Sequence, residues 1–270
     1  MKADLHMHST YSDGSDSLEE IFQKAKKREL THISIVDHDT TAHVEPALKL
    51  SEQYDIKFVP GIEISAFDFA RNRKVHILGY DFTSNMHIKA LCDPLLQRRH
   101  AHSLWQVKQI QQEGYDITEE HALSYVKEGE ILYKQHIMNA LTDADFNSDD
   151  YQKLYRSLFK AGGAAAGDIE YLDAFDAVRA IRADGGYAVV AHPGQLNSFE
   201  ITEELVPYGL NGLEVIHPDH SVEQVNRIVK LSKEYNLFQT GGSDDHGLYG
   251  AMLNSHAFFM ENVKNIPFIK

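Results

Sequence analysis

Short apolar segments with the length of a β-strand recur along the chain, and a histidine or a carboxylate stands at or just beyond the end of each. The expected strands cover residues 3–8, 31–37, 57–65, 74–80, 187–191, 212–216 and 238–242. Helical segments separate several of them, and this alternation is typical of repeated βα units in an α/β fold. Because the carboxyl ends of the strands in a β/α barrel converge on one face, we expect the polar side chains to form a single site there.

Three of the expected helices have clear end signals. Ser17 precedes the helix at 18–29 and is followed three residues later by Glu20, and Ser221 and Gln224 stand in the same relation before the helix at 222–235. Both pairs match the capping box, in which each side chain binds a free backbone N–H at the helix start. The helix at 173–183 is followed by Gly185, which favours its termination.

Residues 94–165 differ in composition from the segments on either side. They are rich in Gln, Glu, Lys, His and Tyr, have helix-like spacing and contain no expected strand. We therefore predict a barrel built from two parts, 1–93 and 166–270, with a small helical cap inserted at 94–165. Leu104, Trp105 and Ile110 are expected in the core of the cap, and Arg98 and His100 in solvent.

The polar side chains near the strand ends form a set with the chemistry of a metal site. The set is His6, His8, Asp13, Asp37, His38, Asp39, Glu63, His76, His192, Glu214, His217, Asp244 and His246. Zn²⁺, Mn²⁺ and Fe²⁺ all accept imidazole and carboxylate ligands. We expect Asp37, Asp39 and Glu214 to orient or cap their neighbours rather than bind metal, and His217 to lie in solvent. The single cysteine, Cys92, is expected to be buried.

The charge of the chain limits its partners. The formal net charge is −14 with histidine neutral, which disfavours broad electrostatic binding to duplex DNA or to an anionic membrane. No apolar run has the length of a membrane span, and the first residues do not resemble a signal peptide. We therefore expect a cytoplasmic protein whose anionic substrate is held by local positive charge.

The same residues occur in motifs that resemble those of the PHP (polymerase and histidinol phosphatase) family. The matching motifs are His6-x-His8 with Tyr11-Ser12-Asp13-Gly14, Asp37-His38-Asp39, Gly61-x-Glu63, His76-x-x-Gly79-Tyr80, Ala191-His192-Pro193-Gly194, Gly212-x-Glu214-Val215 and Gly242-Ser243-Asp244-x-His246. The resemblance covers nearly the whole chain and implies a distorted seven-stranded β/α barrel.

The resemblance also implies a cluster of two or three divalent ions, either Mn²⁺, Fe²⁺ or Zn²⁺. Carried over by position, His6, His8, Glu63 and Asp244 bind one ion. A second ion is bound by His76 and His192, with Glu63 as a bridge. The third is bound by Asp13, His38 and His246.

The insert resembles the helical cap of the PHP branch that includes nucleoside 3′,5′-bisphosphate phosphatases and RNA 5′-end exonucleases. An Arg-x-x-Arg of those relatives reads Arg99-His100-Ala101-His102 here, their Arg-x-His reads Lys134-Gln135-His136, and an arginine that often follows Ala-His-Pro-Gly is Gln195. By this resemblance Arg99, His102, Lys134 and His136 are candidate substrate-binding residues. Lysine and histidine do not reproduce the two-pronged grip of arginine on phosphate, so a smaller or less charged ester, including a diester, is favoured.

These observations predict a metal-dependent phosphoesterase acting on a small phosphate mono- or diester, with a nucleotide, a nucleoside 3′,5′-bisphosphate and short RNA among the candidates. The hypothesis assigns attack on phosphorus to a hydroxide bridging two metals, with Asp13, Glu63 and Asp244 as the ligands that position it. Two alternatives stay open. One is an amidohydrolase-like enzyme acting on a bond other than a phosphate ester, and the other is a PHP protein that binds a ligand without turnover.

Overall fold

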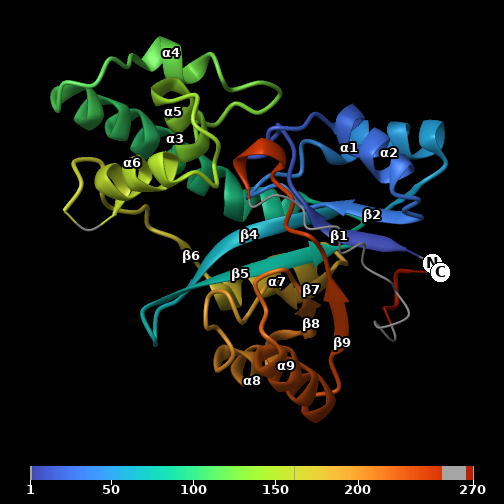
Figure 1. The fold of residues 1–270 in the computed structure, drawn as a ribbon. Helices are drawn as coiled ribbons and strands as arrows, with labels where there is room; N and C mark the ends of the chain where they lie inside the picture. The colour runs from blue at the N-terminus through green and yellow to red at the C-terminus, as the bar shows by residue number, and fades with distance from the viewer. Residues whose placement is uncertain (1, 161, 251–265, 270) are drawn as a thin grey trace.

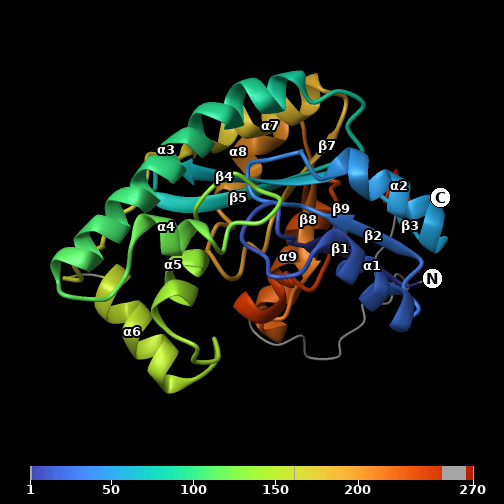
Figure 2. The same ribbon diagram turned by 90° about the horizontal axis from the view of Figure 1, so that it is seen from above.

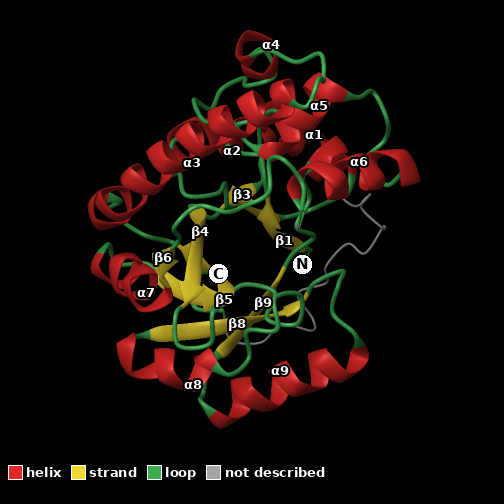
Figure 3. Cartoon of the chain, turned by 90° about the vertical axis from the view of Figure 1, so that its left-hand side faces the viewer, coloured by secondary structure: helices red, strands yellow, loops and turns green. Residues whose placement is uncertain are grey.

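Two β-sheets lie in the middle of the molecule in the computed structural model, which describes residues 2–160, 162–250 and 266–269. The strands are β1 (Ala3–Met7), β2 (His32–Ile35), β3 (Lys57–Phe58), β4 (Gly61–Asp68), β5 (Arg73–Tyr80), β6 (Leu172–Asp173), β7 (Tyr187–Val190), β8 (Leu210–Ile216) and β9 (Phe238–Gly241). The helices are α1 (Leu18–Lys27), α2 (Val44–Tyr54), α3 (Met86–Gln112), α4 (Glu119–Leu123), α5 (Lys134–Leu141), α6 (Asp149–Phe159), α7 (Ala174–Ala183), α8 (Ile201–Leu205) and α9 (Val222–Glu234). Viewed as in Figure 3, the strands occupy the centre and the helices surround them.

The first sheet is parallel and the second is mixed. The first has the order β1-β2-β3, and the second has the order β6-β4-β5-β7-β8-β9. Strand β5 runs antiparallel to both β4 and β7, whereas β7, β8 and β9 are parallel to one another. The chain therefore has an α/β fold, but the expectation that every strand presents its carboxyl end to the site is wrong for β5.

The strand expected at 57–65 is two strands that belong to different sheets. Strand β3 pairs with β2 in the first sheet, and β4 pairs with β5 and β6 in the second. Pro60 lies between them, and because proline has no backbone N–H, it cannot donate to a ladder there. Glu63 is consequently the third residue of β4 rather than a residue at its end.

The two sheets meet where the candidate site residues lie. Isolated bridges join Met7 to Asp245 and His38 to Glu63. Gly242 permits this approach, because a Cβ atom at its position would lie only 2.2 Å from the Cβ of His6. The end of β9 and strand β1 are therefore packed backbone against backbone.

The helices follow the end signals in the sequence closely. The capping boxes of Ser17 with Glu20 and of Ser221 with Gln224 are both formed. Helices α1 and α2 lie together beside the first sheet, and α7, α8 and α9 lie against the second (Figure 1). No helix within the described ranges is both long and apolar enough to cross a membrane.

Helix α3 is continuous across the expected boundary between residues 93 and 94. Its first half packs Ile88, Cys92 and Leu95 into the core beneath the second sheet, and Cys92 is buried as expected. Its second half packs Val107 and Ile110 into a separate core shared with α4, α5 and α6. These four helices project to one side of the sheets (Figure 2).

The prediction that Leu104, Trp105 and Ile110 lie in the core of this helical group is right for Ile110 and wrong for Trp105. Ile110 is fully buried, and Leu104 packs against the same core. Trp105 is 40% exposed, and its ring stacks on His102 one turn earlier. Trp105 thus lies at the edge of the group, where an indole can bury one face and keep its N–H near water.

Candidate metal centre

Strand β1 delivers His6 and His8 to the same side of the sheet, because side chains two residues apart on a strand point the same way. Both rings are buried. The Nε2 atoms of His6 and His8 each lie 3.3 Å from Oδ1 of Asp244, and they lie 3.3 and 3.1 Å from Oε2 of Glu63. These four side chains form one group whose ligand atoms are all within 4.8 Å of one another.

Glu63 lies at the centre of the cluster and is 1% exposed. Its Oε1 is 2.8 Å from Nδ1 of His76 and 2.9 Å from Nε2 of His192. Its Oε2 is 3.4 Å from Nδ1 of His38, in addition to the contacts with His6 and His8. One carboxylate therefore faces five imidazoles, and its two oxygens would allow Glu63 to bridge two cations.

Asp13 is the carboxylate of a second group. Its oxygens lie 3.4 Å from Nε2 of His246, 3.8 Å from Nδ1 of His8 and 3.9 Å from Nε2 of His38. The ligand atoms of these four residues also lie within 4.8 Å of one another. Gln135 of α5 donates its amide to the other side of Asp13 at 2.9 Å, so a helix outside the sheets helps to hold this carboxylate.

Two ligand candidates have backbone conformations that most residues avoid. His192 has φ +23° and Asp244 has φ +54°. The left-handed region is tolerated by aspartate but costs a histidine roughly 1–3 kcal/mol. The surrounding bonds hold both in place, since the backbone N–H of His192 donates to Glu214 at 2.7 Å and that of Asp244 donates to the carbonyl of His6 at 2.8 Å.

The donor set fits divalent cations. Within the described residues, four buried ring nitrogens of the cluster make no hydrogen bond of good geometry: both nitrogens of His8, Nδ1 of His38 and Nδ1 of His192. Two of them, Nε2 of His8 and Nδ1 of His38, face Oε2 of Glu63 at 3.1 and 3.4 Å. A buried polar atom without a partner is costly, and a cation bound by the ring removes that cost for the nitrogens that face the centre. Imidazole and carboxylate ligands without thiolate suit Zn²⁺, Mn²⁺ and Fe²⁺.

The carboxylates of the cluster stay charged in spite of their burial. Burial alone would raise the pKa of Asp13, Glu63 and Asp244, but the adjacent imidazoles hold the pKa of each well below its usual range. Burial dominates at His38 and lowers its pKa to about 4, which leaves a neutral ring with a free lone pair. At His8, burial is outweighed by Asp244 and Glu63, which raise its pKa to about 10. The centre therefore attracts positive charge.

Two further buried carboxylates, Glu214 and Asp37, hold parts of the cluster in position, as expected. Oε1 of Glu214 lies 3.0 Å from Nδ1 of His6, which directs the opposite nitrogen of His6 towards the cluster. Asp37 accepts hydrogen bonds from the backbone and hydroxyl of Ser9 and from the hydroxyl of Ser12. It thereby fixes the loop that carries Asp13.

His217 was expected in solvent, and this expectation is wrong. The residue is 6% exposed. Its Nδ1 accepts the backbone N–H of Asp219, and its Nε2 lies 3.2 Å from Oδ2 of Asp244. Since Nδ1 is an acceptor, Nε2 carries the proton and donates to Asp244. Its place directly after β8, matching that of the other site residues after their strands, was the signal in the sequence.

One cavity beside the cluster has a volume of about 310 Å³ and is lined by Arg99, His102 and Lys134 together with Asp13, His38 and His76. Arg99 donates to Asp39 at 2.7 Å and to the hydroxyl of Ser65 at 2.9 Å. The carboxylate of Asp39 therefore orients the guanidinium of Arg99. Nε of Arg99 is buried and makes no hydrogen bond within the described residues.

His136 lies outside this cavity. It is 3% exposed, and its Nδ1 accepts the backbone N–H of Tyr133 at the start of α5. Its role in substrate binding stays a prediction. Arg98 is exposed as expected, whereas Nδ1 of His100 accepts the backbone N–H of Leu132.

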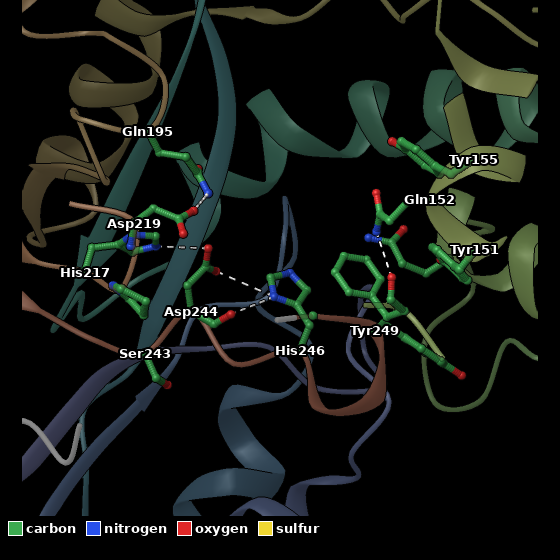
Figure 4. A pocket seen from close by; sticks show the side chains of 14 residues that line it. Tyr151, Gln152, Tyr155, Gln195, His217, Asp219, Ser243, Asp244, His246 and Tyr249 are labelled. Atoms are coloured by element: carbon green, nitrogen blue, oxygen red, sulfur yellow. Dashed lines mark hydrogen bonds and ion pairs between the residues drawn. The ribbon is translucent and has the colours of Figure 1, made fainter. Parts of the chain in front are cut away.

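A second cavity, of about 480 Å³, adjoins the cluster at Asp244 and His246 (Figure 4). Asp244 and His246 lie in its middle. Tyr151, Gln152 and Tyr155 of α6 form one wall, and Gln195, His217 and Asp219 form the wall opposite. Gln135 and Tyr155 line both cavities, so the two cavities adjoin each other next to the cluster.

Comparisons with known proteins agree with this geometry. A protein from Eggerthella lenta named "Phosphoribosyl 1,2-cyclic phosphate 1,2-diphosphodiesterase" is 47% identical to the chain over 251 residues, covering 93% of this chain and 96% of that protein. A "5'-3' exoribonuclease" from Haemophilus influenzae is 27% identical, covering 91% of this chain and 90% of that protein.

A solved structure from Bifidobacterium adolescentis, described as that of a metal-dependent phosphoesterase, superposes with a TM-score of 0.83 at 30% identity. It covers 92% of this chain and 88% of the other. The model of the PHP domain matches residues 4–183. The chain therefore belongs to the PHP family and is a metal-dependent phosphoesterase.

Proposed function

We propose that this phosphoesterase hydrolyses the cyclic phosphodiester of a small phosphorylated sugar, of the kind named for its relative from Eggerthella lenta, phosphoribosyl 1,2-cyclic phosphate. The observation that carries the proposal is the charge of the 310 Å³ cavity next to the cluster. Arg99, Lys134 and Lys74 line it, but Asp39 pairs with Arg99 and Asp168 pairs with both lysines. Asp13 also lines the cavity but is counted with the metal cluster, so the other five groups leave a surplus of about one positive charge, which suits one terminal phosphate.

Nine side chains are proposed as ligands of two or three divalent ions, Mn²⁺, Fe²⁺ or Zn²⁺. In this assignment His6, His8, Glu63 and Asp244 hold one ion, Glu63, His76 and His192 a second, and Asp13, His38 and His246 a third. The interatomic distances within the cluster support the assignment. Such ions lower the pKa of bound water towards about 7 and polarise phosphoryl oxygens.

The chain's own residues position the substrate against this centre. Arg99 is held by Asp39 and Ser65 over the ring of Tyr133, so its guanidinium is fixed before substrate binds. Asp13, Glu63 and Asp244 keep their negative charge and hold the centre in place. We place the cyclic phosphate at the cluster and the terminal phosphate against Arg99, with His102 and Lys134 beside it.

The finer description of the architecture is part of the same proposal. We infer that the two sheets act as one distorted barrel, with residues 1–93 and 166–270 as its parts and 94–165 as a helical cap. The bridges between the sheets and the separate core of α3–α6 support this division. The cap then supplies Arg99, His102 and Lys134, and the sheets supply the ligands.

The test is a turnover assay on protein loaded with Mn²⁺. Phosphoribosyl 1,2-cyclic phosphate, a nucleoside 3′,5′-bisphosphate and a short 5′-phosphorylated RNA are compared at equal concentration. We expect the highest kcat/KM for the cyclic diester, because the cavity has charge for one terminal phosphate. An Arg99→Met variant should lose most of this preference. A higher kcat/KM for the bisphosphate or the RNA would refute the proposal.

A further inference from the structure

The 480 Å³ cavity differs in chemistry from the cavity that holds Arg99. Among the described residues that line it there is no lysine or arginine, and Asp219 adds a negative charge. A phosphate group has no cation to pair with there, apart from the cluster itself. The polar side chains of its walls are instead amides and hydroxyls, and aromatic rings complete the lining (Figure 4).

The orientation of the glutamine amides shows what the walls offer to a ligand. Nε2 of Gln152 donates to the carbonyl of Phe146 at 2.7 Å, and Nε2 of Gln195 donates to Asp219 at 2.9 Å. Both partners are oxygens that can only accept, so each amide must turn its nitrogen towards them. The carbonyl oxygens of the two amides accept no hydrogen bond within the described residues and remain available as acceptors.

Such a wall selects for hydroxyl groups and against phosphate. Amide oxygens and the Asp219 carboxylate accept hydrogen bonds, and a sugar hydroxyl can donate one to each. Phosphate oxygens are also acceptors, so they gain nothing from these groups and are repelled by Asp219. The rings of Tyr151 and Tyr155 line the same wall as Gln152, and an aromatic ring can pack against the apolar face of a sugar.

We propose that this cavity is a subsite for the uncharged, hydroxyl-bearing sugar ring of the substrate and of its hydrolysed product, with the side-chain carbonyls of Gln152 and Gln195 as hydroxyl acceptors. The cyclic diester has one free ring hydroxyl and therefore engages one of the two carbonyls, whereas ribose 5-phosphate has three hydroxyls and can engage both. The inference rests on the proposed function, because it places the scissile phosphate at the cluster and the terminal phosphate against Arg99. Gln135 and Tyr155 line both cavities, so a single ligand can reach from one to the other past the cluster.

The experiment compares Gln152→Met and Gln195→Met with the wild-type protein on two diesters. One is phosphoribosyl 1,2-cyclic phosphate, and the other is bis(4-nitrophenyl) phosphate, which has no hydroxyl group. Because the sugar diester has one free hydroxyl, one of the two variants should lower kcat/KM for it about five- to tenfold more than for the nitrophenyl diester, the factor expected for one neutral hydrogen bond. Gln111→Met on the exposed face of α3 is the matched control and should leave the ratio of the two kcat/KM values unchanged.

A second measurement separates this inference from the proposed function. Calorimetric binding of ribose 5-phosphate to the metal-loaded protein should weaken about five- to tenfold in both variants and stay unchanged in the control. If the wild-type protein leaves the cyclic diester intact, the proposed function fails, while a weakened Kd still sustains the subsite. The subsite is overturned if both variants lose the same factor in kcat/KM on the two diesters, or if their Kd for ribose 5-phosphate is unchanged.

Discussion

At the scale of single residues, Glu63 holds the central position in the cluster, because five imidazoles lie within 3.4 Å of its two oxygens. The variant Glu63→Gln keeps the shape of the side chain and removes its charge. We expect it to lose at least one ion per chain and more than about 100-fold in kcat, beyond the 10–100-fold typical of residues that only orient a ligand. Metal analysis by mass spectrometry and the diester assay measure both effects.

The matched control for this variant is Glu45→Gln, which changes an exposed carboxylate on α2. It should retain its full metal content and turnover. Retention of metal and activity by Glu63→Gln as well would contradict the role of Glu63 as a bridge.

Glu214 is expected to act through His6 rather than on the metal directly. The variant Glu214→Gln removes the charge that orients the ring of His6, which lies 3.0 Å away. We predict a metal affinity about 10–100-fold weaker, with a turnover that recovers at saturating metal. A titration of metal-free protein with Mn²⁺, followed by kinetics, measures this. A kcat that stays low at saturating Mn²⁺ would show that Glu214 does more than orient His6.

Among single residues, the sequence predicted which side chains gather into the cluster better than it predicted the surroundings of other residues. His6, His8 and Glu63 were recognisable because ligand chemistry restricts the residue types and their spacing on a strand. The burial of His217 and the exposure of Trp105 depend on which segments pack over them. No local pattern encodes that packing for Trp105, whereas the place of His217 directly after β8 did point to the site.

At the scale of elements, the N-terminus of α3 is held by a residue from another part of the chain. Asp184, which follows α7, accepts the backbone N–H of Ile88 at 2.9 Å and lies 2.8 Å from Nδ1 of His87. The residue before α3, Asn85, makes no capping hydrogen bond with its side chain. Asp184 therefore replaces a local cap and also opposes the positive end of the helix dipole.

We predict that Asp184→Ala lowers the free energy of unfolding by about 0.5–2 kcal/mol at neutral pH, the usual range for the loss of a cap. Burial would raise the pKa of Asp184, but the bonds from Ile88 and His87 hold it below its usual range. Because the pKa of Asp184 is lower in the folded state than in the unfolded state, its stabilisation is present at pH values above the unfolded-state pKa of about 3.9. It is lost as the pH falls through the folded-state pKa.

Urea unfolding at several pH values measures this difference. The difference in the free energy of unfolding between the wild type and Asp184→Ala should have its full size at pH 7 and should decrease below about pH 4. Asp143→Ala, in an exposed loop, is the control and should change stability by less than about 0.5 kcal/mol. A gap that is constant down to strongly acidic pH would contradict the capping role.

The direction of β5 is an element-scale feature that the sequence does contain. Only residues 69–72 separate β4 from β5. Parallel neighbours need a crossover of about a dozen residues, whereas a short turn joins antiparallel strands. The expectation that every strand presents its carboxyl end to the site gave more weight to the general barrel pattern than to the length of this turn. His76 still reaches the cluster, because it pairs with Ser65 in register and lies beside Glu63 on the adjacent strand.

At the scale of the whole molecule, the cluster joins parts of the chain that are far apart in sequence. Its proposed ligands come from β1, β4 and β5 and from the segments after β1, β2, β7 and β9, and the two sheets meet there through the bridges at Asp245 and Glu63. Bound ions would therefore link both sheets. The family motifs made the set of ligands predictable, whereas the division into two sheets depends on long-range pairing and was not apparent.

We expect removal of the ions to destabilise the entire fold. Ligands that bind only the folded state stabilise it by mass action, by about 4 kcal/mol when the free ion is at 1,000 times its Kd. For a chain of this size each kcal/mol corresponds to about 2–4 °C in Tm, so the chelated protein should melt about 10 °C lower and should recover on addition of Mn²⁺. The Glu63→Gln variant is the internal control, because its Tm should respond less to chelator. An unchanged Tm in protein shown by metal analysis to be free of ions would mean that the sheets hold together without the metal centre.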